Sequence, residues 1–288
     1  MIAVFKREAY MYFQSMTAYV FGAFLLLFTG VGALVYNLHA SIANFELVLN
    51  FIALILVVLI PLLTMRILSE ERRQKTDQLL YSLPITSVDV IVGKFLALML
   101  VFAIPMVIIC AYPLIFKQYG DVYLPTSYGS IFAFLLLGMT LISIGIFISS
   151  LTESQGMAAG ICVAVMIFIY YSDTLAENIS STTTGAVISL IVLILAVSLL
   201  IRYMTRSWLA AAVSAVLLAA GLAVCYKVIG TSFEGLLPAV MNQISLFSRF
   251  RTFVYGIFDV TAIIYDISIT VFFLFLSVQS FEKRRYNG

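Results

Sequence analysis

The ionisable residues that could act together are concentrated in one connection between two apolar runs. The tetrad Glu70-Glu71-Arg72-Arg73 lies in this connection, which extends from Arg66 to Lys94. Helix-forming residues fill its first part up to Pro84, with the charged residues ahead of a leucine-rich end. A short helix with one polar and one apolar end suits contact with a protein partner, and a solvated loop of ordinary charge is the alternative.

The sequence contains no set of residues that matches an enzyme site. Hydrolysis of ATP requires a phosphate-binding loop of the form GxxxxGK[ST], whereas the Gly93-Lys94 pair is followed by Phe95 and lacks the upstream glycine. His39 is the sole histidine, so a zinc site based on histidine has no second ligand. The cysteines lie singly in apolar runs, without a CxxC spacing, at Cys110, Cys162 and Cys225. We therefore expect neither a catalytic site nor a metal or cofactor site in this chain.

Two features inside apolar runs each have two possible roles. Asp266 lies near the start of the last run, where it is either a buried polar site that binds or relays an ion, or a carboxylate at the outer headgroups. Gly156 and Gly160 form a GxxxG pattern that allows two helices to approach closely. That pattern serves packing within one subunit or contact with a second copy.

The composition places these residues in a membrane protein. Of 288 residues 63% are hydrophobic and 10% are charged, and the mean hydropathy is +1.11. The net charge of +2 gives no reason to expect a nucleic-acid partner. A membrane helix needs about 20 apolar residues, and lipid excludes open sheets, so the sequence predicts an all-α polytopic protein with about eight crossings. The runs are Ala18–Tyr36, Val48–Met65, Phe95–Phe116, Tyr128–Leu151, Gly156–Ser172, Gly185–Ile201, Leu209–Tyr226 and Ala262–Phe281.

The cations predict the orientation of these crossings. With both termini in the cytosol and eight alternating crossings, most of the 16 Lys and Arg residues fall inside, and the outside segments hold Lys117, Lys227, Arg249 and Arg251. This distribution follows the positive-inside rule. The sequence therefore predicts a multi-pass protein of a prokaryotic plasma membrane, with both termini cytoplasmic.

Three segments of the single transmembrane domain, residues 1–288, are not crossings. Residues 1–17 predict an interfacial helix, and a frayed tail that supplies positive charge is the alternative. The apolar side chains at helical spacing in this segment are Ile2, Phe5, Ala9, Phe13 and Met16. Residues 66–94 form the long cytosolic connection, in which Thr86 to Asp89 fits a capping box that starts the third crossing. Residues 230–261 predict one or two amphipathic helices on the outer surface.

Specific motifs resemble the permease subunit of ABC-2 type transporters, in its gliding-motility-type branch. The first block runs from Pro61 to Arg66 and on through the Glu-Glu-Arg-Arg tetrad to Gly93-Lys94-Phe95. The further blocks are Phe5–Phe13 with Ala18–Phe21, Gly145–Gln155, and Ser248–Asp259 with Glu282–Arg285. Two departures are Lys75 and Gln78, where many relatives have glycine and glutamate. A third is the helix pair 185–226, because many relatives have six crossings.

The resemblance implies a subunit of an ATP-driven exporter that moves an unidentified amphipathic or hydrophobic substrate outward. A second permease subunit and separate cytosolic ABC ATPase subunits, which bind ATP and Mg²⁺, are the implied partners, and an auxiliary subunit with an extracytoplasmic domain is a further candidate. The residues that would contact the ATPase are Glu70, Glu71, Arg72, Arg73, Thr76, Leu79, Leu80 and Pro84. The alternatives are a non-transporting membrane anchor or regulatory subunit and, less in keeping with the few buried charges, an ion-coupled transporter.

Overall fold

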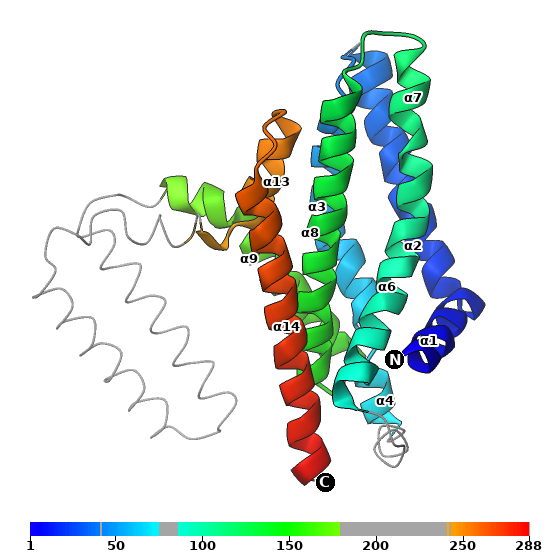
Figure 1. Cartoon of the computed structure of the whole chain (residues 1–288), viewed down its shortest axis with the longest axis vertical. Coiled ribbons are helices and arrows are strands. Elements are labelled where there is room, and N and C mark those ends of the chain that lie inside the picture. The colour runs from blue at the N-terminus through cyan, green and yellow to red at the C-terminus, as the bar shows by residue number, and fades with distance from the viewer. Residues whose placement is uncertain (41, 75–85, 179–240, 242, 288) are drawn as a thin grey trace, which may run out of the picture. The chain divides into compact units, whose positions relative to one another are not determined.

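The computed structural model describes residues 1–40, 42–74, 86–178, 241 and 243–287, and every regular element in these ranges is helical (Figure 1). The all-α class is thereby confirmed. The chain divides into two compact units, residues 1–170 with 246–288 and residues 171–245, and most of the second lies outside the described residues. The helices are α1 (Ile2–Gln14), α2 (Met16–Gly32), η1 (Ala33–His39), α3 (Glu46–Thr64), α4 (Ser69–Arg73), α6 (Ser87–Ile109), α7 (Ala111–Lys117), α8 (Leu124–Leu151), α9 (Gln155–Asn178), α13 (Leu246–Val254) and α14 (Val260–Asn287).

Six helical stretches of the described chain are long and apolar enough to cross a membrane. They are Met16–His39, Glu46–Arg73, Ser87–Lys117, Leu124–Leu151, Gln155–Ala176 and Val260–Lys283. Each contains one of the predicted apolar runs, and a polytopic membrane protein is confirmed. The remaining predicted pair, Gly185–Ile201 and Leu209–Tyr226, lies outside the described residues.

Helix α8 packs against helices from both ends of the chain, namely α3, α6, α13 and α14. Glycines allow its closest contacts. A Cβ on Gly138 would overlap the Phe102 ring of α6, and a Cβ on Gly145 would overlap Thr64 Oγ1 of α3. These two positions therefore set how closely α8 approaches its neighbours.

A sharp break at Ser15, whose backbone is extended, separates α1 from α2 and turns α1 out of the direction of α2 (Figure 1). Helix α1 packs on α6 and buries Val4, Ala9 and Tyr12. Its buried face differs from the apolar stripe expected from spacing alone, because Ile2 is largely exposed. Packing against α6, rather than amphipathicity by itself, thus selects the buried face.

Helix α6 begins as its capping box predicts. Thr86 has extended backbone and its Oγ1 accepts a hydrogen bond of 3.2 Å from Asp89 N. The same hydroxyl donates to Asp89 Oδ2 over 2.8 Å. The side chain of Thr86 thus satisfies one of the backbone donors that every helix start leaves without a partner.

Helix α13 lies in the described part of the segment predicted as amphipathic, residues 230–261. It buries Phe247, Phe250 and Phe253 and contacts α8 and α3. Ser130 Oγ donates to Phe253 O over 2.9 Å. Ser130 lies six residues, or roughly 9 Å, from the start of α8. Helix α13 therefore packs against one end of the bundle through its apolar face.

Candidate functional site

A buried lysine on α6 contacts α1, α4 and the short segment between α3 and α4. Lys94 Nζ on α6 lies 3.0 Å from Glu8 Oε1 on α1 and 2.8 Å from Glu71 Oε1 on α4. It also donates to Ile67 O over 3.1 Å. An ammonium group has three N–H donors, so this geometry uses all of them. We call Glu8, Glu71 and Lys94 the junction cluster.

Because the junction cluster is buried, each of its charges is stabilised only while its oppositely charged partners are present. The Lys94 side chain is 1% exposed and that of Glu8 is 3% exposed. Arg7 adds a second cation at 3.6 Å from Glu71 Oε1. Removing one member of a buried ion pair leaves an uncompensated charge, which is far more costly than losing a surface pair. The cluster therefore requires α1, α4 and α6 to stay together.

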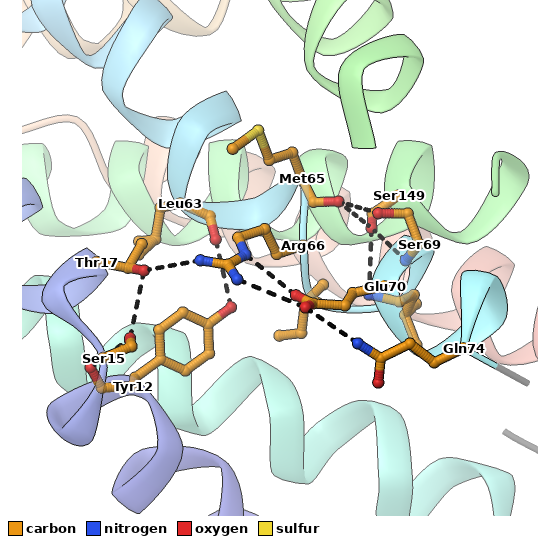
Figure 2. Close-up of polar contacts among 12 residues, drawn as sticks. Tyr12, Ser15, Thr17, Leu63, Met65, Arg66, Ser69, Glu70, Gln74 and Ser149 are labelled. Atoms are coloured by element: carbon orange, nitrogen blue, oxygen red, sulfur yellow. Dashed lines mark hydrogen bonds and ion pairs between the residues drawn. The ribbon is translucent and has the colours of Figure 1, made fainter. Parts of the chain in front are cut away.

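Arg66 makes a second connection at the same junction (Figure 2). Its Nε donates to Glu70 Oε2 over 3.1 Å, and its Nη1 donates to Thr17 Oγ1 over 3.3 Å. Gln74 Nε2 donates to the other oxygen of Glu70, Oε1, over 3.4 Å. The guanidinium thus joins the end of α3 to α4 and to the first turn of α2.

Ser149, near the end of α8, fixes the break between α3 and α4 (Figure 2). Its Oγ accepts from the backbone N–H groups of Leu68 and Ser69 over 3.2 and 3.3 Å and donates to Met65 O over 3.2 Å. Ser69 Oγ also donates to Met65 O. One hydroxyl from α8 therefore serves both the last turn of α3 and the first turn of α4.

Tyr12 connects α1 to the end of α3. Its hydroxyl donates to Leu63 O over 3.3 Å, as Figure 2 shows. Burial raises the pKa of Tyr12 well above its usual value, and the negative charge of Glu8 adds to the shift. The phenol therefore remains protonated and keeps its donor role.

The predicted tetrad forms most of α4. Glu71 and Arg72 are buried and Arg73 is exposed. The other residues proposed to contact the ATPase, Thr76, Leu79, Leu80 and Pro84, lie outside the described residues. The predicted set omitted Glu8, Arg66, Lys94 and Ser149, which the structure brings to the tetrad. A signal was present for Lys94, since it directly precedes an apolar run and an unpaired cation at that position would be costly if buried.

Asp266 lies inside the bundle. The residue is 6% exposed, and within the described part of the chain its Oδ1 accepts no hydrogen bond. Thr270 and Thr140 donate to its backbone O over 2.8 and 3.4 Å. Thr140 is sixteen residues, or roughly 24 Å, along α8, so Asp266 is at the level of the middle of that helix.

Gly156 and Gly160 lie on an exposed face at the start of α9. A Cβ added to either glycine would meet nothing within 4 Å in the described structure. The neighbouring Ala158 and Cys162 are buried in the core instead. The two glycines therefore make no close contact to another described helix of the subunit.

These elements define a polytopic helical membrane protein with an ion-paired junction at one end of its bundle. A model of the family described as ABC-2 family transporter protein matches residues 2–278, so the chain belongs to this family. It is accordingly a permease component of ABC transporters, a class that works in a membrane with ATPase partners. No curated protein matches the sequence. No solved structure matches it either.

Proposed function

We propose that this protein is the membrane-spanning permease subunit of an ATP-driven exporter of the ABC-2 type. Two permease subunits would span the plasma membrane with both termini in the cytosol, and separate ATPase subunits would hold ATP and Mg²⁺. The substrate moves outward and is amphipathic or hydrophobic. The gliding-motility-type branch is the proposed subfamily, on the motifs that resemble it.

The observation that carries this proposal is the junction cluster, which connects a short polar helix to the crossings. Helix α4 presents the exposed Arg73, whereas Glu71 on the same helix contacts Lys94 on α6 over 2.8 Å. A force applied to α4 by an ATPase would therefore reach α6 through a buried ion pair. Ser149 would carry the same displacement to α8, because its hydroxyl binds both sides of the α3–α4 break.

The test is reconstitution of the permease with its cognate ATPase in vesicles. We expect Arg73→Ala to lower substrate-stimulated ATPase activity and transport while leaving membrane insertion unchanged. Lys117→Ala is the matched control, because Lys117 is also exposed but ends α7 at the other end of α6. Equal coupling in both variants would overturn docking at α4.

Vectorial transport separates the exporter from the alternative of a membrane anchor or regulatory subunit. Movement of a solute that requires ATP supports the exporter. ATP turnover by the complex without movement of any solute supports the anchor. Transport without an ATPase, lost in Asp266→Asn, would instead indicate an ion-coupled carrier.

A further inference from the structure

A polar pocket of about 370 Å³ lies beside the junction cluster. It is lined by residues of α1, the first turn of α2, the end of α3, α4 and α6. Pockets of roughly 300 Å³ and more hold small ligands. The proposed function gives this pocket no role.

The charged side chains that line this pocket differ in how exposed and how firmly paired they are. Glu8 and Lys94 are nearly sealed and are paired with each other. Arg7 and Arg66 are 49% and 41% exposed, and both line the pocket. Glu70 also lines the pocket and is 32% exposed, but both of its oxygens accept hydrogen bonds from Arg66 and Gln74. The two guanidinium groups are therefore the accessible charged groups with donors to offer an incoming ligand.

The two guanidinium groups keep donor capacity. A guanidinium carries five N–H donors. Arg66 uses three of its nitrogens on Glu70 and Thr17, and the contact of Arg7 with Glu71 spans 3.6 Å. The acceptors of Glu70, in contrast, are already occupied by Arg66 and Gln74. Spare guanidinium donors favour an anion with several oxygens, and phosphate is the group that these donors match best.

The position of the pocket indicates where such a phosphate comes from. It lies where α2 begins and α3 ends, and both helices belong to candidate membrane spans. Met11 on its lining is 45% exposed, and the neighbouring Met16 and Tyr19 are more exposed still. Exposed apolar and aromatic side chains at the end of a span are typical of the headgroup level of a bilayer. A ligand there needs a phosphate for the arginines and a chain that follows the apolar rim.

We propose that this pocket binds the phosphate of a bilayer phospholipid, held by Arg7 and Arg66. The lipid would join α1 to the α3–α4 break. If the lipid is bound there, coupling of the ATPase to transport should require it, and this consequence rests on the proposed function. The binding itself does not.

Native mass spectrometry of the full-length permease, without the ATPase, tests the binding. The probes are phosphatidylethanolamine, phosphatidylglycerol and diacylglycerol with identical acyl chains. We expect both phospholipids to be retained and diacylglycerol, which lacks the phosphate, to be lost. Arg7→Gln should weaken phospholipid binding roughly tenfold, because it removes a charge-assisted contact. Lys283→Gln is the control, since Lys283 is an exposed cation on α14.

Three results would overturn the proposal. The first is equal retention of diacylglycerol and the phospholipids, and the second is unchanged affinity in Arg7→Gln and in Arg66→Lys. The third is displacement of the lipid by inorganic phosphate at equal concentration, which would identify a soluble phosphate ligand. Arg66→Lys keeps a positive charge near Glu70, so we expect the variant to fold. It loses the planar guanidinium group, whose two parallel donors match a phosphate. Because no ATPase is present, failure here leaves the docking of α4 to be decided by its own experiment.

Discussion

Lys94 on α6 and Glu71 on α4 form an ion pair of 2.8 Å in which the lysine side chain is 1% exposed. Ion pairs at a protein surface contribute little and exchange readily with water. A buried pair instead makes the separation of its two helices costly. The junction cluster therefore allows α4 to move only together with α6 and, through Glu8, with α1.

Replacing Lys94 should break this junction. In Lys94→Met the carboxylates of Glu8 and Glu71 remain buried without their ammonium partner. We expect a loss of about 3–5 kcal/mol in the free energy of unfolding, as for other broken buried pairs. Thermal unfolding in detergent, with Lys117→Met as the exposed control, measures the effect.

A triple variant gives that prediction a stricter form. Glu8→Gln and Glu71→Gln, combined with Lys94→Met, remove every charge of the junction cluster. We expect the triple variant to recover most of the lost stability, because the unpaired charge causes the loss. Coupling to the ATPase should stay low, since the amides cannot restore the ion pair. A triple variant as unstable as Lys94→Met would show that packing, not charge, decides stability here.

Ser149→Ala should loosen the break between α3 and α4. The substitution leaves the buried N–H groups of Leu68 and Ser69 without the hydroxyl that accepts from them. A buried donor without a partner costs about 1–3 kcal/mol. Hydrogen exchange should accelerate at these two amides while exchange in the centre of α8 is unchanged.

Ser268→Ala is the matched control for Ser149→Ala. The Ser268 hydroxyl is exposed and donates within its own helix, to Ile264 O over 2.7 Å. Its loss should leave exchange at the α3–α4 break unaffected. Equal exchange rates in the two variants would mean that Ser149 does not hold the break.

Gly145→Ala tests the close contact of α8 with α3. A Cβ at this position would overlap Thr64 Oγ1 and lie 2.8 Å from Thr64 Cβ. We expect a loss of about 1–3 kcal/mol from overpacking, which exceeds the gain of up to ~1 kcal/mol in helix propensity. In Gly129→Ala, where the Cβ meets nothing within 4 Å, the gain should remain. Thermal unfolding of both variants decides, and a stabilised Gly145→Ala would contradict the contact.

The crossings could be predicted from the sequence because hydrocarbon imposes a local requirement on each. A run of about 20 apolar residues must form a helix whatever its neighbours are. The start of α6 was predictable for a similar reason, since Thr86 and Asp89 act within a single turn. Such features need no knowledge of which helices meet.

The junction cluster could not be predicted in this way. Glu8 and Lys94 are 86 positions apart, and only the packing of α1 on α6 brings them together. The face that α1 buries was likewise set by its neighbour, so Tyr12 lies inside and Ile2 outside. The role of Ser149 could not be predicted either, because its partners are backbone N–H and C=O groups, which nearly every residue type provides. Tertiary pairing therefore determined the site, whereas local composition determined the class.

The exposed glycines of α9 lead to a prediction about the second subunit. Gly156 and Gly160 meet no other described helix, so a partner copy is the contact we expect for their GxxxG face. Gly160→Leu should leave the unfolding temperature of the subunit unchanged and shift the dimer toward monomer, because a leucine side chain prevents the close approach of two helices that a GxxxG face allows. Gly129→Leu controls for an added side chain at another open position. Single-molecule photobleaching in bilayers counts subunits for both variants, and a dimer that withstands Gly160→Leu as well as Gly129→Leu would place this face against lipid.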